Sequence, residues 1–390
     1  MSFDPVHVLP TAVRPTSVMV RGEGDFLFDH EGERYLDFVQ GWAVNALGHA
    51  SPVVADALAR QARTLVMASA AFYNAPQLAL SDRLAAASGL DHVFVCSTGA
   101  EANESAIKLA RKWGSIHRRG AYGLVTTEGG FHGRTLATMS ASGKPEFAPL
   151  FEPKVPGFRK VPFGDAAAIE SAIDDTVAAI LVEPVQGEAG VVVPPAGYLA
   201  ELRAIADRHG ILLMLDEVQT GIGRCGTLFA FQGEGVLPDV LTLGKGLGAG
   251  FPIAAMLCRA EVSCFAPGDQ GGTYAGHPLA SSVGDAVVRT VSEPSFLAGI
   301  EERSARLFAV LRGLATKHGA VEVRGKGLLV AMDLGRPIGR EVVDAARAKG
   351  LLLNAPRPHL LRFMPALNVE LASIDAMGSI LDEVLGELGS

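Results

Sequence analysis

Three polar residues stand at or just after the ends of apolar runs that are typical of buried strands. They are Glu183, Asp216 and Lys245. In open α/β sheets, ligands collect at the carboxyl ends of the strands. We therefore expect these side chains to lie together in one site.

Lys245 lies in the glycine-rich segment LGKGLGAG at 243–250. A lysine among glycines after a strand could belong to a phosphate-binding turn. The P-loop pattern requires Ser or Thr directly after the lysine, but Gly246 follows here. A desolvated lysine with a lowered pKa is suited instead to attack a carbonyl and form an imine. The segment favours this second interpretation.

A second glycine turn, STGAE at 97–101, comes between an expected strand and an expected helix. A helix N-terminus presents free backbone N–H groups and the positive end of the helix dipole to an anion. Alone this turn is weak support, and an isolated Asp216 could equally cap a helix. Together, an anion cradle, a lysine nucleophile and a carboxylate are the parts needed to hold a phosphorylated aldehyde cofactor.

The elements that must position these residues follow an alternating pattern. Apolar strands alternate with helical segments, which predicts an α/β fold with a mainly parallel central sheet and helices on both faces. The expected strands are 92–96, 178–182, 211–215 and 240–243, and the expected helices are 51–66, 101–113 and 198–209.

The pattern changes after about residue 280, which predicts a second, smaller α+β domain. Its expected helices are 278–290, 296–318 and 340–349, and its expected strands are 321–324 and 328–331. An N-terminal arm and a hairpin with strands 25–29 and 34–38 are expected to join it. The predicted division is 1–50 for the arm and hairpin, 51–280 for the large cofactor-binding domain and 281–390 for the small domain.

Composition excludes several classes of function. The chain has 390 residues, 48% hydrophobic and 19% charged, which indicates a well-packed protein. A formal net charge of −8 without a cluster of Lys and Arg argues against nucleic acid as a partner. The four cysteines lack metal-ligand spacing, so no metal is expected. No apolar stretch could span a bilayer and no secretory signal is recognised, so we expect a cytoplasmic protein without a membrane partner.

Six blocks of sequence, in order and spacing, resemble the class III aminotransferases of the type I pyridoxal-phosphate fold. The blocks are CSTGAEAN at 96–103, FHGRT at 131–135, EPVQGE at 183–188, LDEVQTG at 215–221, LGKG at 243–246 and GTY at 272–274. The resemblance covers nearly the whole chain. It implies an aminotransferase that uses pyridoxal 5′-phosphate, works as a homodimer with shared active sites, and takes 2-oxoglutarate as amino acceptor.

The resemblance also implies roles for single residues around the phosphate. Thr98, Gly99 and Ala100 are expected to bind the phosphate, mainly through backbone N–H groups. Thr273 is expected to reach the phosphate of the neighbouring subunit.

Around the pyridine ring, the resemblance places Phe131 on one face and Val218 on the other. Asp216 is expected to keep the ring nitrogen protonated, and Gln219 to reach the phenolic oxygen. Lys245 is expected to form the Schiff base and then to act as acid and base.

For the substrate, the resemblance points to Arg134 and Arg362, which could fork onto two carboxylates. Glu188 is expected to neutralise an arginine while the amino donor is bound. Trp42 is expected near the substrate side chain, with core packing as the alternative. For Arg362 taken alone, the alternative is a surface strand residue.

Segments 40–49 and 353–358 are most similar to the acetylornithine aminotransferase branch. The implied reaction converts N2-acetyl-L-ornithine and 2-oxoglutarate into N-acetyl-L-glutamate 5-semialdehyde and L-glutamate, in arginine biosynthesis. Ornithine, succinylornithine, succinyl-diaminopimelate and 4-aminobutyrate transamination stay open, and glutamate 1-semialdehyde mutase is a more distant alternative. Four departures from the family pattern bear on the preferred donor: Ala189, Cys225, Ala275 and His277.

Overall fold

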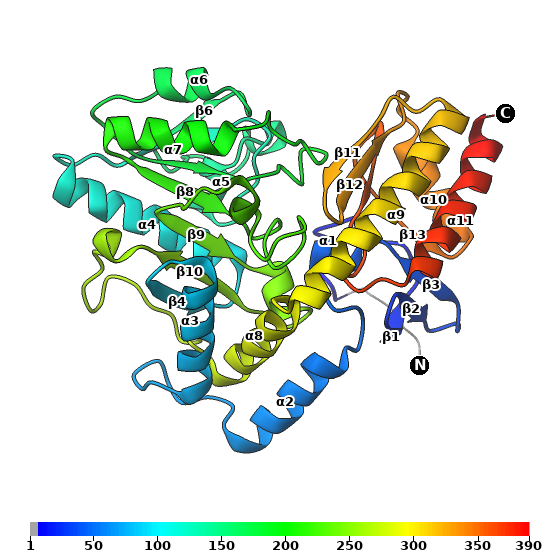
Figure 1. Ribbon diagram of the computed structural model, residues 1–390, viewed down its shortest axis with the longest axis horizontal. Helices are drawn as coiled ribbons and strands as arrows, with labels where there is room; N and C mark the ends of the chain where they lie inside the picture. The colour runs from blue at the N-terminus through cyan, green and yellow to red at the C-terminus, as the bar shows by residue number, and fades with distance from the viewer. Residues whose placement is uncertain (1–6, 390) are drawn as a thin grey trace.

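The computed structural model describes residues 7–389 and divides into a large and a small lobe (Figure 1). Residues 1–6, with which the expected N-terminal arm begins, and residue 390 lie outside the described range. The large lobe is built around a seven-stranded sheet, and two four-stranded sheets belong to the small lobe.

The central sheet has the strand order β4-β10-β9-β8-β7-β5-β6. All neighbours from β9 to β6 are parallel, whereas β10 is antiparallel to both β4 and β9. The prediction of a mainly parallel sheet is therefore confirmed. The strands are β4 (His92–Cys96), β5 (Gly123–Thr127), β6 (Phe158–Val161), β7 (Val177–Val182), β8 (Leu212–Asp216), β9 (Val240–Leu243) and β10 (Ala254–Cys258).

Both faces of this sheet are buried, because successive side chains of a strand point to opposite faces. In β7, Ala179 and Leu181 pack with α4 (Gly99–His117), while Ile180 and Val182 belong to the core that contains α7 (Tyr198–His209). This explains why the strands are continuous apolar runs. Each strand end then delivers its first polar residue to the same edge of the sheet.

Three helices of the large lobe pack together below the sheet (Figure 1). They are α2 (Pro52–Thr64), α3 (Ala75–Ser88) and α8 (Pro278–Val291). Pro52 occupies the first turn of α2 as predicted, although the Ser51 side chain makes no capping hydrogen bond. Beyond α8, α9 (Pro294–His318) runs across into the small lobe.

In the small lobe, α9, α10 (Gly339–Ala348) and α11 (Leu371–Gly389) pack beside a sheet of order β11-β12-β15-β14. The N-terminal hairpin pairs with this part of the chain, because β3 is parallel to β13. The small-lobe strands are β1 (Met19–Glu23), β2 (Phe26–Asp29), β3 (Arg34–Asp37), β11 (Glu322–Lys326), β12 (Leu329–Asp333), β13 (Leu351–Leu352), β14 (Asn354–Arg357) and β15 (Leu360–Phe363).

Short helices occupy the connections between these elements. They are α1 (Gln40–Ala43), α5 (Leu136–Ala141), α6 (Ala166–Ser171) and the 3₁₀ helices η1 (Pro145–Phe147), η2 (Ala230–Glu234), η3 (Lys245–Gly248) and η4 (Ala260–Val262). Between residues 7 and 389, no helix combines the length and the apolar character that crossing a membrane requires.

Candidate active site

A cavity of about 200 Å³ opens at the carboxyl ends of the central strands. It brings together most of the residues that the sequence nominated, and Thr98, Trp42, Arg134, Thr273 and Arg362 are not part of its wall. The lining residues are Gly99, Ala100, Asn103, Phe131, His132, Gly133, Glu183, Glu188, Asp216, Val218, Gln219 and Lys245.

The Asp216 carboxylate is held by three donors. Its Oδ2 accepts from Asn103 Nδ2 and lies 2.8 Å from His132 Nδ1, and its Oδ1 accepts from the Val218 N–H at 3.0 Å. Asn103 is fixed in turn by the Thr242 hydroxyl, which donates to its Oδ1 at 2.7 Å. These side chains are almost fully buried. A carboxylate surrounded in this way keeps one orientation and stays an acceptor.

Two further buried groups share this electrostatic environment. Burial lowers the pKa of His132, but the hydrogen bond to Asp216 and the charges of Asp216 and Glu183 outweigh this and raise it above its ordinary value. Burial raises the pKa of Glu183 to about 7, and the charge of His132 works against that shift. The Glu183 carboxylate accepts the Phe131 N–H at 2.9 Å, so Glu183 positions the backbone that carries the ring of Phe131.

Sequence reasoning assigned no role to His132, Asn103 or Thr242. Both His132 and Asn103 lie inside blocks that carry the family resemblance, 131–135 and 96–103. Asn103 also occupies the buried face of α4 among alanines and aliphatic residues. A lone amide on an apolar helix face was the signal that could have found it, because buried polar groups need partners.

Lys245 opens η3 directly after β9 and is partly buried in the cavity wall. Its φ of 41° is in the left-handed region, which is uncommon for a non-glycine residue and typical of functional sites. Burial lowers the pKa of Lys245, as does the charge of Arg362, while the carboxylates of Glu188, Glu183 and Asp216 oppose the shift. A larger share of this amine is therefore neutral and nucleophilic than in an exposed lysine.

The start of α4 forms the expected anion cradle, with one difference. The Thr98 side chain accepts from the Glu101 N–H, while the N–H groups of Ser97 and Thr98 donate to the Glu101 carboxylate at 2.9 Å. The N–H of Thr98 is thus occupied in this structure. Gly99 and Ala100, as the first helical positions, have N–H groups without an intrahelical partner, and they remain available to an anion.

Close backbone contacts in the wall require glycine. A Cβ on Gly99 would lie 2.7 Å from Val218 Cγ1, and one on Gly187 would lie 1.5 Å from Gln219 Oε1. Within residues 7–389, the buried amide nitrogen and oxygen of Gln219 find no hydrogen-bond partner. A polar group left unpaired beside a cavity indicates a bound ligand atom. The wall thus fits pyridoxal phosphate, with Val218 and Phe131 as apolar surfaces, Gln219 as an unpaired polar group and α4 as the phosphate site.

Arg362 lies behind this wall on β15 and is only 1% exposed, so the alternative of a surface strand residue is wrong. Its Nη1 is 2.8 Å from Glu188 Oε1 and donates to Gly187 O at 2.9 Å, and its Nε donates to Asn354 Oδ1 at 3.0 Å. Burial raises the pKa of Glu188, but nearby cations, first Arg362 and then Lys245 and Lys144, bring it down to about 2. Glu188 is therefore ionised at neutral pH.

Three nominated residues lie further from the cavity. The exposed Arg134 guanidinium stands 5.8 Å from the ring centroid of Phe147. Trp42 is 54% exposed, so core packing is not its role. Thr273 is exposed in the loop before α8. In the described range, no group of three or more His, Cys, Asp or Glu side chains could hold a metal ion.

Comparison with known proteins identifies the family. The family described as aminotransferase class-III matches residues 9–385. Acetylornithine aminotransferase 2 of Bordetella bronchiseptica is 52% identical over 97% of the chain and 96% of that relative. Acetylornithine aminotransferase of Ralstonia nicotianae is 51% identical over 95% of both chains.

Solved structures with the same architecture include two enzymes with different named donors. The ornithine aminotransferase of Toxoplasma gondii has a TM-score of 0.94 and 32% identity, over 98% of this chain and 94% of its own. The N-acetylornithine aminotransferase of Stenotrophomonas maltophilia has a TM-score of 0.85 and 35% identity, over 96% of this chain and 97% of its own. Backbone similarity therefore does not separate the two donors, whereas the relatives at 51–52% identity are both named for acetylornithine.

Proposed function

Since this chain belongs to the class III aminotransferase family, we propose that it moves the terminal amino group of N2-acetyl-L-ornithine to 2-oxoglutarate. The products are N-acetyl-L-glutamate 5-semialdehyde and L-glutamate, as in arginine biosynthesis. The cofactor is pyridoxal phosphate. The observation that carries the donor is the identity of 51–52%, over nearly the whole chain, to relatives named for acetylornithine.

The groups of this chain divide the chemistry between them. When bound, pyridoxal phosphate supplies an aldehyde carbon and an electron-accepting ring. Lys245 provides the amine for the aldehyde, and its lowered pKa leaves Nζ able to take a proton from the carbon that bears the transferred nitrogen. Asp216, oriented by its hydrogen bonds with Asn103 and His132, keeps a proton on the ring nitrogen.

Two arginines serve the substrates in this proposal. Arg134 binds the carboxylate of the amino donor, and Arg362 binds a carboxylate of 2-oxoglutarate. While the donor is bound, Glu188 stays on Arg362 at 2.8 Å and neutralises it. The same pocket then accepts a substrate with one carboxylate or with two, which an aminotransferase needs in its two half-reactions.

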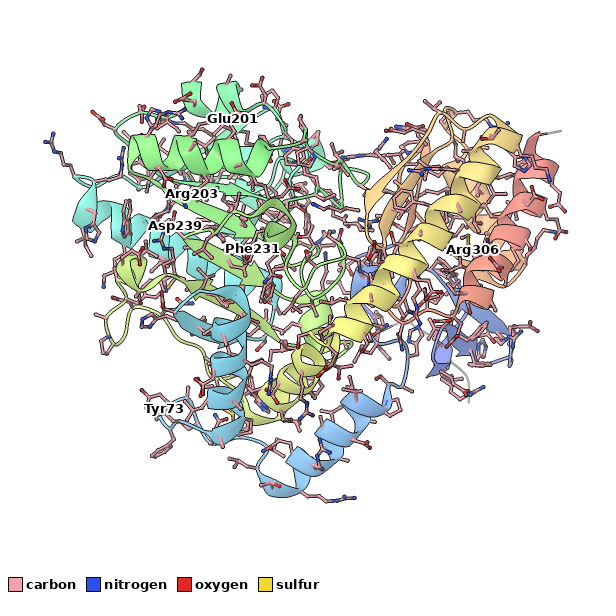
Figure 2. The ribbon with its side chains drawn as sticks, in the orientation of Figure 1. Tyr73, Glu201, Arg203, Phe231, Asp239 and Arg306 are labelled. Carbon is pink, nitrogen blue, oxygen red and sulfur yellow. The ribbon has the colours of Figure 1, made fainter. Side chains whose placement is uncertain are left out.

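We also propose that the working unit is a homodimer in which Thr273 completes the partner's phosphate site. Thr273 and the neighbouring Tyr274, 61% exposed, project from the surface beside the exposed rings of Phe72 and Tyr73. Asn74 Nδ2 donates to Gly276 O at 2.8 Å, so the two loops lie side by side. Figure 2 shows Tyr73 pointing away from the lobe that carries it. Exposed apolar patches of this kind mark protein interfaces.

A cytoplasmic location belongs to the same proposal. All four cysteines are free thiols, and Cys96, Cys225 and Cys258 are buried. Thiols without disulfide partners are typical of proteins in a reducing compartment. The substrates of the proposed reaction are small and soluble metabolites.

The donor is tested by turnover with a panel of amines. Purified holoenzyme is incubated with 2-oxoglutarate and N-acetylornithine, ornithine, succinylornithine, succinyl-diaminopimelate or 4-aminobutyrate, and glutamate formation is measured. The highest kcat/KM is expected for N-acetylornithine. A preference for free ornithine would overturn the donor assignment, and turnover of glutamate 1-semialdehyde without any keto acid would indicate a mutase. The Lys154→Gln variant, altered at a residue that does not line the cavity, serves as a control for preparation effects.

A further inference from the structure

Lys144 is a cation that neither the resemblance nor the proposed reaction uses, although it contacts the residue that neutralises Arg362. It directly precedes η1 (Pro145–Phe147). Its Nζ lies 3.2 Å from Glu188 Oε2, while Arg362 Nη1 lies 2.8 Å from Glu188 Oε1. The Glu188 carboxylate is therefore bridged between two cations, one on each oxygen.

The two cations differ in how firmly they are held. Arg362 is 1% exposed and is fixed by Asn354 and by the Gly187 carbonyl as well as by Glu188. The Lys144 side chain is 17% exposed, and its amine lies 5.1 Å from the ring centroid of Phe131. Arg362 is thus fixed behind the cavity wall, whereas Lys144 is a partly exposed side chain with fewer contacts.

Aromatic rings keep that arm in place. Besides Phe131, the ring centroid of Phe147 is 5.9 Å from Lys144 Nζ. A lysine amine within about 6 Å of a ring centroid is attracted by the ring's negative face. The amine therefore stays close to Glu188 even when the carboxylate turns.

An incoming dicarboxylate must take Arg362 away from Glu188, because the arginine is fixed and the glutamate is the movable partner. A carboxylate that loses its only cation in a largely buried place carries the full cost of an unpaired charge. Here Oε2 already contacts Lys144, so Glu188 can leave Arg362 and still keep an ionic partner.

We propose that Lys144 is the resting partner of the displaced Glu188, and so sets how easily the site changes from the amino donor to the dicarboxylate acceptor. This inference rests on the proposed function, in which Arg362 binds 2-oxoglutarate. Lys144 is a positioning residue, since it acts through Glu188 and not on the reacting atoms.

The test uses glutarate, a dicarboxylate that cannot react, titrated calorimetrically into the holoenzyme. In Lys144→Gln, the dissociation constant for glutarate should rise about tenfold, the loss expected for a half-buried ion pair. The KM for 2-oxoglutarate should rise with it, while the KM for the amino donor changes less than about twofold, since Glu188 then stays on Arg362. Lys144→Arg should restore glutarate binding. Lys154→Gln, which disrupts a lysine–glutamate pair of 3.5 Å on the same stretch of chain, should leave it unchanged.

A double-mutant cycle separates the indirect role from a direct one. In a Glu188→Gln background, Lys144→Gln should change the dissociation constant for glutarate less than about twofold, because no carboxylate needs a second partner. An equal loss in both backgrounds would mean that Lys144 contacts the ligand itself and would overturn the proposal. Unchanged binding in Lys144→Gln alone would do the same. If wild-type enzyme binds no glutarate and uses no 2-oxoglutarate, the proposed function fails instead.

Discussion

Gly99 and Val218 pack against each other in the wall of the cofactor cavity, and their contact allows a sharp test of its geometry. An added Cβ on Gly99 would lie 2.7 Å from Val218 Cγ1 and 3.0 Å from Cγ2, but 3.5 Å from Cβ. Alanine at position 99 therefore collides only with the two methyl groups. Removing these methyl groups in Val218→Ala leaves an ordinary van der Waals contact.

These distances set the expected losses of cofactor affinity. Overpacking by one methyl group costs about 1–3 kcal/mol, so Gly99→Ala should weaken pyridoxal phosphate binding by roughly 5- to 150-fold. Val218→Ala removes two methyl groups from the wall and should weaken binding by about 1.5 kcal/mol, roughly tenfold. Because alanine fits at position 99 once the methyl groups are gone, the double variant should bind no worse than Val218→Ala alone.

The assay is titration of the apoenzyme with pyridoxal phosphate, followed by absorbance, for both single variants and the double variant. Gly313→Ala is the control, since a Cβ at that exposed position of α9 meets nothing within 4 Å. Urea unfolding of each apoenzyme checks that the fold is retained. Wild-type affinity in Gly99→Ala, or additive losses in the double variant, would refute the geometry of this wall.

Three further perturbations follow from the described contacts. The Asn103→Ala variant leaves the Thr242 hydroxyl without its buried acceptor. We expect it to lower the free energy of unfolding, measured in urea, by about 2–4 kcal/mol. A loss below about 1 kcal/mol would contradict the hydrogen-bond network around Asp216. Burial raises the pKa of Glu217 from 4.5 to about 7, so the folded state holds the proton more tightly than the unfolded state. The contribution of Glu217 to stability is therefore complete below pH 4.5 and falls by about 3 kcal/mol as the pH rises to 7. In Glu217→Gln, the midpoint of urea unfolding should fall less over this pH range. A pH profile identical to that of the wild type would contradict the raised pKa of Glu217. Thr273→Val should lose cofactor affinity, and mixing it with inactive Lys245→Ala should restore one complete site per mixed dimer. If native mass spectrometry shows mixed dimers and no activity is regained, the shared site is contradicted.

Much of the fold could be predicted from residues 178–243, because buried parallel strands are continuous apolar runs. β5, β6 and β10 were not predicted. β5 ends in two threonines, Thr126 and Thr127, that are buried at the sheet end, and β10 follows a glycine-rich loop that hides its start. β10 is antiparallel both to β9, the preceding strand in the chain, and to β4, which is far away in the sequence.

The site also contains residues that the sequence predicts and residues that it does not. Asp216 and Lys245 could be found because each sits at a strand end, where local pattern and chemistry coincide. The partners of Asp216 could not, since Asn103 lies 113 residues away and reaches the carboxylate only once α4 packs on the sheet. The role of Lys144 could not be predicted for a similar reason, because it depends on contact with Glu188, 44 residues further along the chain.

Chemical trapping shows directly whether Lys245 carries the cofactor. Purified holoenzyme is reduced with borohydride, digested, and the modified lysine is located by mass spectrometry. We predict one pyridoxyl-modified residue, Lys245, with Lys144 and the other lysines unmodified. A label on any other lysine, or a holoenzyme from which no labelled peptide can be recovered, would contradict the account.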